Sequence, residues 1–241
     1  YLYHEDWQKA ADAATEVINS KRYALWTAED MAQAECYRQN VGGSEVIFEI
    51  YSNTSNSYGG GNESITYLTN PDGYGDATCP DDIHAQLGYE PTDARGGLFY
   101  TDAKETHIWT AKYYGKGVGK PDYANVIIFR LSEMYLTRAE ALANGASVEG
   151  ATAVSDLAAV ATRCGATPGT GLAGIYAERA KEFCWEGHLW FDLGRTGRPM
   201  ERADKNDGCP ATVAAGSKEW AMPLPEREFA VNPNLVQNEG Y

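Results

Sequence analysis

Acidic side chains at one-turn spacing in the segment from Glu178 to Gly197 are the first feature of this sequence that could do chemistry. Glu182 and Glu186 stand four residues apart, and hydrolysis of a glycosidic bond needs two carboxyl groups about 5 to 10 Å apart. Their spacing alone therefore meets the requirement of a glycoside hydrolase. The same spacing beside Arg179 and Lys181 is more typical of carboxylates held in helix ion pairs, which is the interpretation we favour.

Histidine and cysteine side chains form no metal-binding pattern in the sequence. None of the four histidines has a second ligand at metal spacing, and the five cysteines include no C-x-x-C pair. The segment NPDGYGD, with Asn70, Asp72 and Asp76, is superficially similar to a calcium loop, but its spacing fails that pattern and Pro71 to Gly73 is a turn signal. We therefore predict no metal ion and no cofactor, with calcium at this loop as the alternative.

Bulk composition narrows the class of protein. The chain has 241 residues, 43% of them hydrophobic, and a formal net charge of -14. This content is sufficient for a buried core, whereas the negative charge argues against nucleic acid or an anionic membrane surface as a partner. No apolar run reaches the roughly 18 residues that a membrane-spanning helix needs.

Helices are the elements that must position the acidic side chains. An apolar stripe from Tyr176 to Phe191 predicts one continuous helix through Gly187, and a glycine inside a helix suggests that another backbone passes close by. Helices 125–143 and 148–164 are expected to form a hairpin of tetratricopeptide size, ending at Gly165, and the opening helices to form a second such unit. The remaining predicted elements are helices 5–20, 27–39 and 81–87, a strand at 44–51, a long loop at 52–75 and an extended stretch at 98–114.

Three separated segments share their order and spacing with one family. The first is FRLSEMYLTRAEALA, with matches at Arg130, Glu133, Tyr135, Arg138, Ala139 and Glu140. The second is ERAKEFCWEGHLWFDLGRTG, with matches at Glu178, Arg179, Glu182, Glu186, Gly187, Trp190, Asp192, Leu193 and Arg195. The third closes the chain, with matches at Asn232, Pro233, Asn234, Leu235, Gln237, Asn238, Gly240 and Tyr241.

Together with Asp93 and Arg95, these motifs resemble the C-terminal half of the SusD/RagB family. Glu239 departs from the resemblance because the family usually has proline there, and family members are typically about twice as long as this chain. We therefore interpret residues 1–241 as a single SusD-like domain from a longer protein. The fold expected is mostly α, with tetratricopeptide-like helical hairpins, a long loop-rich, irregular face and little β.

The resemblance implies a non-catalytic lipoprotein of the outer membrane of Bacteroidetes-type bacteria, exposed at the cell surface and serving nutrient uptake in polysaccharide utilisation. Such a protein captures a poly- or oligosaccharide and delivers it to a TonB-dependent, SusC-like transporter. Any attachment to the membrane would come from an N-terminal lipid anchor outside this chain. The shared motifs are scaffold, so they identify the family without locating its binding site.

The glycan site is predicted in a loop-rich insertion at residues 52–124. A pyranose stacks its C–H faces on aromatic rings and pairs its hydroxyls with polar groups, so its site needs tyrosine or tryptophan beside Asn or Asp. The insertion offers this mixture. The candidate glycan-binding residues are Tyr58, Tyr67, Tyr74, Asn53, Asn56, Asn62, Asn70, Asp72 and Trp109.

Two other classes of function stay open at this point. A peptide- or protein-binding adaptor would also be built from antiparallel helical hairpins, and its binding face would be the helical layer. A glycoside hydrolase would need two carboxylates that converge in a pocket. Ion pairs that tie up Glu182 and Glu186 would remove those two residues from such a role.

Overall fold

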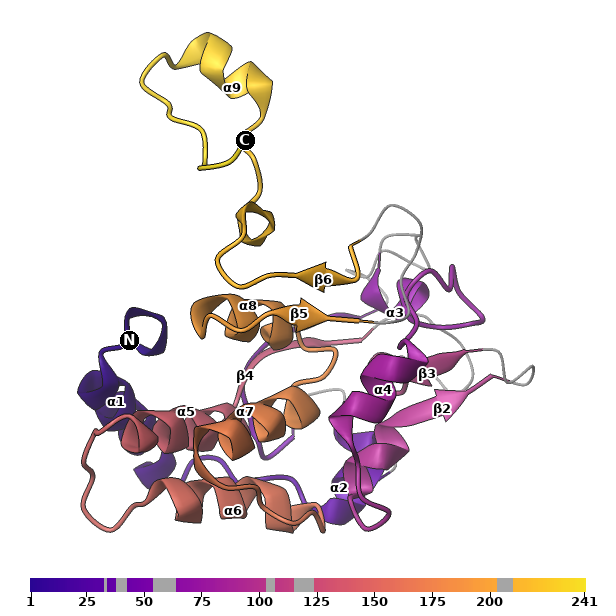
Figure 1. Cartoon of the computed structure of the whole chain (residues 1–241). Coiled ribbons are helices and arrows are strands. Elements are labelled where there is room, and N and C mark those ends of the chain that lie inside the picture. Colours follow the sequence, from indigo (N-terminus) through magenta and orange to yellow (C-terminus); the bar gives the residue numbers. More distant parts are fainter. Residues whose placement is uncertain (33, 38–42, 54–63, 103–106, 115–123, 203–209) are drawn as a thin grey trace. The chain divides into compact units, whose positions relative to one another are not determined.

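The computed structural model of the protein describes residues 1–32, 34–37, 43–53, 64–102, 107–114, 124–202 and 210–241. The chain forms two compact units, Tyr1–Gly187 and His188–Tyr241. Helices make up most of the regular structure, and the strands occur in short antiparallel pairs (Figure 1). This confirms the predicted mostly α fold with little β.

Helix α5 (Leu131–Ala143) is the centre of the first unit. It packs against α1 (Trp7–Asn19), α6 (Ala153–Arg163) and α7 (Gly171–Glu182) (Figure 1). Helices α5 and α6 form the predicted hairpin. The core shared by α5, α6, α7 and the turn that follows α7 consists of Leu136, Ala139, Leu157, Val160, Ile175 and Phe183.

The opening helices do not form the second hairpin that the sequence predicts. Helix α1 packs on α5 through small residues, with Ala10, Ala11 and Ala141 buried together. Helix α2 (Ala28–Ala32) is short, is followed by the 3-10 turn η2 (Glu35–Tyr37), and lies against η3 (Ala94–Leu98). The predicted second hairpin is therefore wrong. Alanine at a contact lets the backbones of any two helices approach closely, so an alanine-rich face does not determine that the partner is the helix that comes next in the sequence.

Strand β4 (Val126–Arg130) occupies the first part of the segment predicted as one helix over 125–143. It pairs antiparallel with β1 (Val46–Ile50), the strand that the alternation at 44–51 predicts. Only from Leu131 onward is the segment helical. The β-branched run from Val126 to Ile128 favours a strand, and a partner strand far away in sequence decides the outcome.

Residues 52–124 of the first unit begin and end at neighbouring points, because β1 and β4 are paired. The amide of Ser52 donates to Asn125 Oδ1 at 3.0 Å, which closes the base of this segment. Its described part contains α3 (Ile65–Leu68), α4 (Asp81–Leu87), η3 and a hairpin of β2 (Phe99–Thr101) with β3 (Ile108–Thr110). The predicted helix 81–87 is confirmed, and the expected extended stretch is the hairpin.

Helix α7 ends at Glu182, so the prediction of a continuous helix through Gly187 is wrong. Trp185 and Gly187 have φ of 69° and 81°, in the left-handed region that a right-handed helix cannot contain. A Cβ added at Gly187 would meet no described atom within 4 Å. The prediction of a close backbone neighbour is therefore also wrong, and the glycine serves the conformation of the turn.

The second unit contains α8 (His188–Arg195), a hairpin of β5 (Met200–Glu201) and β6 (Thr212–Val213), η4 (Lys218–Trp220) and α9 (Glu226–Val231). Side-chain amides fasten its last residues. Gln237 exchanges hydrogen bonds with the backbone of Leu224 at 2.8 and 3.0 Å, and Asn238 Nδ2 donates to the carbonyl of Met222. The third sequence motif therefore stabilises the irregular end of the chain.

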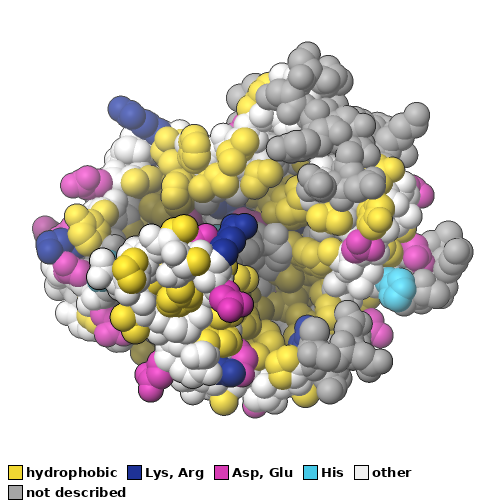
Figure 2. Space-filling model, turned by 90° about the horizontal axis from the view of Figure 1, so that it is seen from above, with side chains coloured by type: hydrophobic (Ala, Val, Ile, Leu, Met, Phe, Trp, Pro, Cys, Tyr) yellow, Lys and Arg dark blue, Asp and Glu magenta, His cyan; other side chains and the backbone are white. Residues whose placement is uncertain are grey.

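On the face seen in Figure 2, lysine and arginine side chains are scattered and form no broad patch outside the residues drawn in grey. Within the described ranges, no helix combines the length and apolar character needed to cross a bilayer.

Gly165 follows the end of α6, and its close approach to the backbone of Thr92 can be tested by substitution. Gly165 and Gly187 both have φ of 81°, but a Cβ at Gly165 would lie 2.3 Å from the carbonyl oxygen of Thr92. We expect Gly187→Ala to lower the free energy of unfolding by about 1 to 2 kcal/mol, the usual cost of the left-handed conformation. Gly165→Ala should cost clearly more. Urea unfolding of both variants measures this, and equal losses would contradict the role of the Thr92 contact.

Candidate functional site

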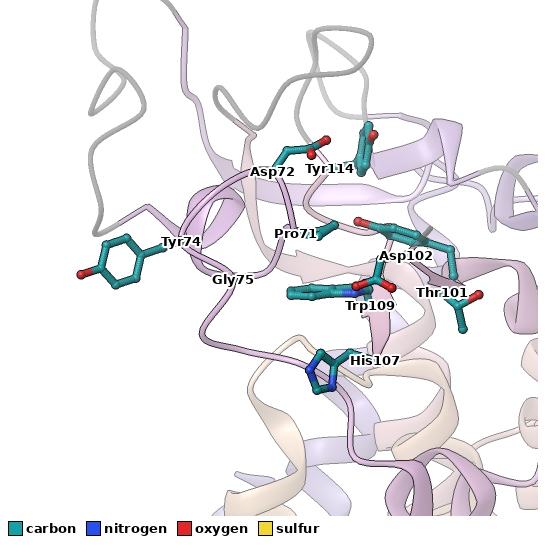
Figure 3. Close-up of a pocket in the computed structure, with 10 residues that line it drawn as sticks. Pro71, Asp72, Tyr74, Gly75, Thr101, Asp102, His107, Trp109 and Tyr114 are labelled. Atoms are coloured by element: carbon teal, nitrogen blue, oxygen red, sulfur yellow. The ribbon is translucent and has the colours of Figure 1, made fainter. Parts of the chain in front are cut away.

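An open cavity of about 660 Å³ lies between the loop 71–75 and the β2–β3 hairpin (Figure 3). Its volume falls within the range of about 300 to 1,000 Å³ that is usual for small-molecule sites. Aromatic and short polar side chains line it together. The lining residues are Pro71, Asp72, Tyr74, Gly75, Tyr100, Thr101, Asp102, His107, Trp109 and Tyr114.

The loop wall of the cavity is built on a tight turn. Asn70 Oδ1 accepts a hydrogen bond from the amide of Asp72 at 2.9 Å, and the carbonyl of Tyr67 accepts from the amide of Tyr74 at 2.7 Å. A Cβ added at Gly75 would lie 3.3 Å from the Trp109 ring. The backbone of the loop therefore rests directly on the indole.

The β2–β3 hairpin supplies the opposite wall. Tyr100 and Trp109 are register partners, so their side chains share one face of the hairpin. Tyr100 also contacts Tyr114 edge to face, with 5.8 Å between ring centroids and 79° between planes. Asp102 follows β2 and His107 precedes β3, which brings a carboxylate and an imidazole to the end of the aromatic wall.

Trp109 carries a hydrogen-bond donor that the described residues leave unused. The residue is 3% exposed, and its Nε1 has no partner in the described part of the chain. The nitrogen end of the indole points toward the part of the cavity where the Asp102 carboxylate lies (Figure 3). A buried donor without a partner costs about 1 to 3 kcal/mol of stability.

The structure brings three of the predicted site residues to this cavity, namely Asp72, Tyr74 and Trp109. Tyr74 stands at its margin: the ring is 56% exposed and points away from the other labelled side chains (Figure 3). Tyr67 shapes the loop through its carbonyl, and Asn70 is buried in the turn.

The other predicted residues are not part of the cavity lining. Asn53 is half-buried just after β1. Tyr58, Asn56 and Asn62 lie outside the described residues. The glycan-binding set as a whole therefore stays a prediction, centred on the three residues that meet at the cavity.

Several lining residues escaped the sequence analysis, chiefly Tyr100, Asp102 and His107. The signal for Tyr100 was the pairing of FYT with IWT as two short strands, which places Tyr100 and Trp109 on one face. No sequence pattern pointed to Asp102 or His107, because they reach the cavity only through the positions at which β2 ends and β3 begins.

In the loop that is superficially similar to a calcium site, the side chain of Asn70 stabilises the backbone turn. Asn70 Oδ1 accepts from the Asp72 amide, so this oxygen stabilises the turn. Among the described residues, no three His, Cys, Asp or Glu side chains are grouped so that they could hold a metal ion. The described geometry therefore does not favour the calcium alternative at this loop.

Glu182 and Glu186 are held in buried ion pairs away from the cavity. Glu182 is fully buried and contacts the guanidinium groups of Arg130 and Arg163, with Arg95 at 2.9 Å. The side chain of Glu186 is 4% exposed and meets Lys112 Nζ at 2.6 Å and Arg130 Nε at 2.8 Å. These two carboxylates therefore cannot flank a glycosidic bond.

The same ion pairs fix the cavity wall to the helical layer. Arg95 of η3 reaches Glu178 of α7 at 2.6 Å, and Asp93 holds that guanidinium at 2.8 Å. Lys112, three residues beyond Trp109, also donates to the carbonyl of Glu182 at 3.0 Å. The conformation of the hairpin thus depends on carboxylates from α7 and the turn that follows it.

The number of cations around each carboxylate determines its pKa. Burial opposes ionisation of Glu186, but Arg130 and Lys112 outweigh it and lower its pKa to about 2. The pKa of Glu182 is also well below its usual range, since Arg163, Arg130 and Arg95 together outweigh its burial. For Glu178, burial outweighs the attraction of Arg95 and raises the pKa.

The described cysteines are free thiols. Burial raises the pKa of Cys36, Cys79 and Cys164 to about 12 and that of Cys184 to about 11. A thiol with such a pKa stays protonated at neutral pH and packs as a small hydrophobic group.

Comparison with known proteins decides the family. The model of the SusD family matches residues 86–241. The chain belongs to the SusD family. SusD-like protein P2 of Formosa agariphila is 27% identical over 290 residues, which cover 100% of this chain and 57% of that protein. The starch-binding protein SusD of Bacteroides thetaiotaomicron is 31% identical over 159 residues, which cover 62% of this chain and 28% of that protein.

Solved structures of SusD relatives share the fold. A SusD superfamily protein from Bacteroides vulgatus matches with a TM-score of 0.86 and 31% identity, covering 100% of this chain and 57% of that one. Surface glycan-binding protein A from Bacteroides fluxus matches with a TM-score of 0.75 at 23% identity, covering 100% of this chain and 60% of that one, which shows likeness of fold. This chain therefore spans somewhat more than half the length of these two relatives.

Acid titration tests the Glu186 ion pairs of this SusD-family chain. In the folded protein the pKa of Glu186 is lowered to about 2. The ionised Glu186 therefore stabilises the folded state at every pH above its unfolded pKa, and this stabilisation is lost as the pH falls toward 2. We expect the unfolding free energy to decrease below pH ~4.5, by on the order of 3 kcal/mol for this group. Glu186→Gln should be less stable at pH 7 and show a flatter acid limb.

Urea unfolding from pH 7 to pH 2.5 measures this dependence. Glu16→Gln is the matched control, because Glu16 is exposed on α1. The control should keep the wild-type profile. An acid limb of Glu186→Gln as steep as that of the wild type would contradict the assignment.

Proposed function

We propose that this SusD-family protein is a non-catalytic glycan-binding protein. It captures a poly- or oligosaccharide at the cell surface and delivers it to a TonB-dependent, SusC-like transporter of the outer membrane. The observation that carries the proposal is the cavity between loop 71–75 and the β2–β3 hairpin, where aromatic rings meet carboxylate, hydroxyl and imidazole groups.

The chemistry of the lining matches that of a sugar ring. A pyranose has C–H faces that pack on aromatic rings, and the half-buried Tyr100 and Tyr114 provide such rings. Its hydroxyls both donate and accept hydrogen bonds, and the lining offers the carboxylates of Asp72 and Asp102 as acceptors and the hydroxyl of Thr101 as a donor or acceptor. The cavity is open rather than closed, which suits a chain-like ligand that continues beyond it (Figure 3).

The relatives support binding rather than catalysis. One is named a starch-binding protein, and several structural neighbours are named surface glycan-binding proteins. In this chain the paired glutamates that could have served hydrolysis are neutralised by buried cations. We expect the protein to bind its glycan without cleaving it. Incubation of the protein with that glycan should therefore release no new reducing ends.

Tyr114→Ala tests the cavity directly. Loss of an aromatic platform worth about 0.5 to 1.5 kcal/mol should weaken glycan binding by about two- to tenfold. Calorimetry with the strongest ligand from a glycan array measures the affinity. Tyr135→Ala is the control, since Tyr135 is also half-buried but lies on α5 and does not line the cavity.

The control should lose stability without losing affinity. Unchanged affinity of Tyr114→Ala would remove the cavity from the site. Binding of peptides by the wild type, with no glycan bound, would overturn the proposed function in favour of the adaptor class.

Delivery to a transporter has its own test. The whole protein, purified from its own membranes in mild detergent, is expected to bring a TonB-dependent barrel with it. Mass spectrometry of the purified material identifies the partner. Recovery of the protein with its glycan but without such a barrel would contradict the delivery step while leaving glycan binding intact.

A further inference from the structure

We infer that Tyr113 and Trp185 are positioning residues for the cavity, and that they act on glycan binding through the ring of Tyr114. This inference rests on the proposed glycan-binding function and adds to it two residues that do not line the cavity. Three observations carry it: the hydrogen bond of Tyr113, the backbone conformation of the residue that accepts this bond, and the contacts that fix the backbone leading to Tyr114.

Tyr113 connects the cavity wall with the turn that follows α7. Its side chain is buried, and its hydroxyl donates to the carbonyl oxygen of Trp185 at 2.9 Å. Burial raises the pKa of this hydroxyl, so the group stays protonated and remains a donor. The next residue along the chain is Tyr114, which lines the cavity (Figure 3). A shift of the Tyr113 backbone would therefore move a ring that can contact sugar.

Trp185, which accepts this hydrogen bond, has an unusual backbone conformation. Its φ is 69°, in the left-handed region that bulky side chains seldom adopt. Such an outlier persists only where its surroundings hold it, and outliers are concentrated at functional sites. In this conformation the carbonyl of Trp185 meets Tyr113, while the carboxylate of Glu186 meets Lys112 at 2.6 Å. The turn thus offers two acceptors to two consecutive residues of the cavity wall.

The backbone that leads to Tyr114 is fixed at each step. The amide of Ala111 donates to the carbonyl of Leu98 at 2.7 Å, and both side chains are buried in one apolar cluster. The amide of Lys112 donates to Thr110 Oγ1 at 3.2 Å. The amide of Tyr114 in turn donates to the carbonyl of Ala111 at 3.4 Å. These bonds place the backbone of Tyr114, and with it the ring, before any ligand arrives.

A ring that is already fixed in its binding orientation favours tighter binding than a mobile one. Ordering a side chain on binding costs free energy, and a platform that the protein has ordered beforehand avoids this cost. Loss of the Tyr113 hydroxyl would leave every lining residue in the sequence but loosen the backbone beside Tyr114. Glycan binding should therefore weaken although no group that contacts the glycan has been removed.

A double-mutant cycle on the whole protein tests the role of Tyr113. We expect Tyr113→Phe to weaken binding of the strongest ligand from a glycan array by about two- to fivefold in calorimetry. Because Tyr113 acts through Tyr114, the same substitution should have no further effect in protein that already carries Tyr114→Ala. A residue that only stabilises the fold would not give this dependence.

Tyr89→Phe is the matched control. The hydroxyl of Tyr89 also donates to a backbone carbonyl of the helical layer, that of Lys181 in α7, at 2.8 Å. Tyr89 neither lines the cavity nor adjoins a lining residue in the sequence. Each of the two substitutions removes one hydrogen bond, so both should lower the free energy of unfolding by similar amounts. Only Tyr113→Phe should lower the affinity for the glycan.

Two substitutions of Trp185 test its backbone conformation independently of Tyr113. Asparagine adopts the left-handed region more readily than other residues with a side chain, whereas the β-branched valine avoids it. Both substitutions remove the indole. Folded Trp185→Asn should therefore bind the glycan at least twofold more tightly than folded Trp185→Val. Thermal unfolding of each variant checks that it is folded.

The outcomes distinguish the inference from the function on which it rests. Wild-type affinity of folded Tyr113→Phe, or a loss that is equally large in the presence of Tyr114→Ala, would overturn the inference and leave glycan binding standing. An equal loss of affinity in Tyr89→Phe, or equal affinities of the two Trp185 variants, would also overturn it. Failure of the wild type to bind any glycan would overturn the proposed function together with the inference.

Discussion

Burial of several carboxylates around the end of α7 is the constraint on which the rest of the first unit depends. Five carboxylates meet four cations in this network, so it holds one negative charge in excess. The raised pKa of Glu178 agrees with such an excess, and the hydroxyl of Tyr37 donates to Glu186 at 3.1 Å. Because an unpaired buried charge is so costly, every segment that brings a cation is fixed in position. The members are Asp93, Glu45, Glu178, Glu182, Glu186, Arg95, Arg130, Arg163 and Lys112.

The network explains how a region with few regular elements presents a defined cavity. Short strands and single helical turns cannot bury enough apolar surface to hold themselves in place. Leu98 and Ala111 are buried in one apolar cluster with Trp26 and Met31, and Arg95 and Lys112 bind the two ends of the η3–β2–β3 segment to the carboxylates. Tyr113 adds a hydrogen bond to the carbonyl of Trp185 at 2.9 Å. The aromatic wall between these ties is therefore as firmly placed as the helices behind it.

The sequence predicted the scaffold better than the site, for physical reasons. Helical periodicity found α5, α6 and α7 because their buried faces recur every third or fourth residue. It failed at Val126 to Arg130, where a distant strand overrode the local pattern, and at Gly187, where backbone conformation rather than packing selects glycine. Tyr100 and Asp102 belong to the cavity through hairpin register, which no single segment encodes. The family motifs include Glu182 with Arg95 and Arg130, whereas none of the residues that line the cavity belongs to these motifs.

The pairing of β1 with β4 has a consequence for how such a protein can change. Because the two strands lie side by side, a replacement for residues 52–124 would begin and end at one place and leave the helical core unbroken. Yet a transplanted segment must carry counterparts of Arg95 and Lys112, because Glu178 would otherwise lose Arg95 and Glu186 would keep Arg130 alone. The insertion is thus exchangeable only as a matched electrostatic module.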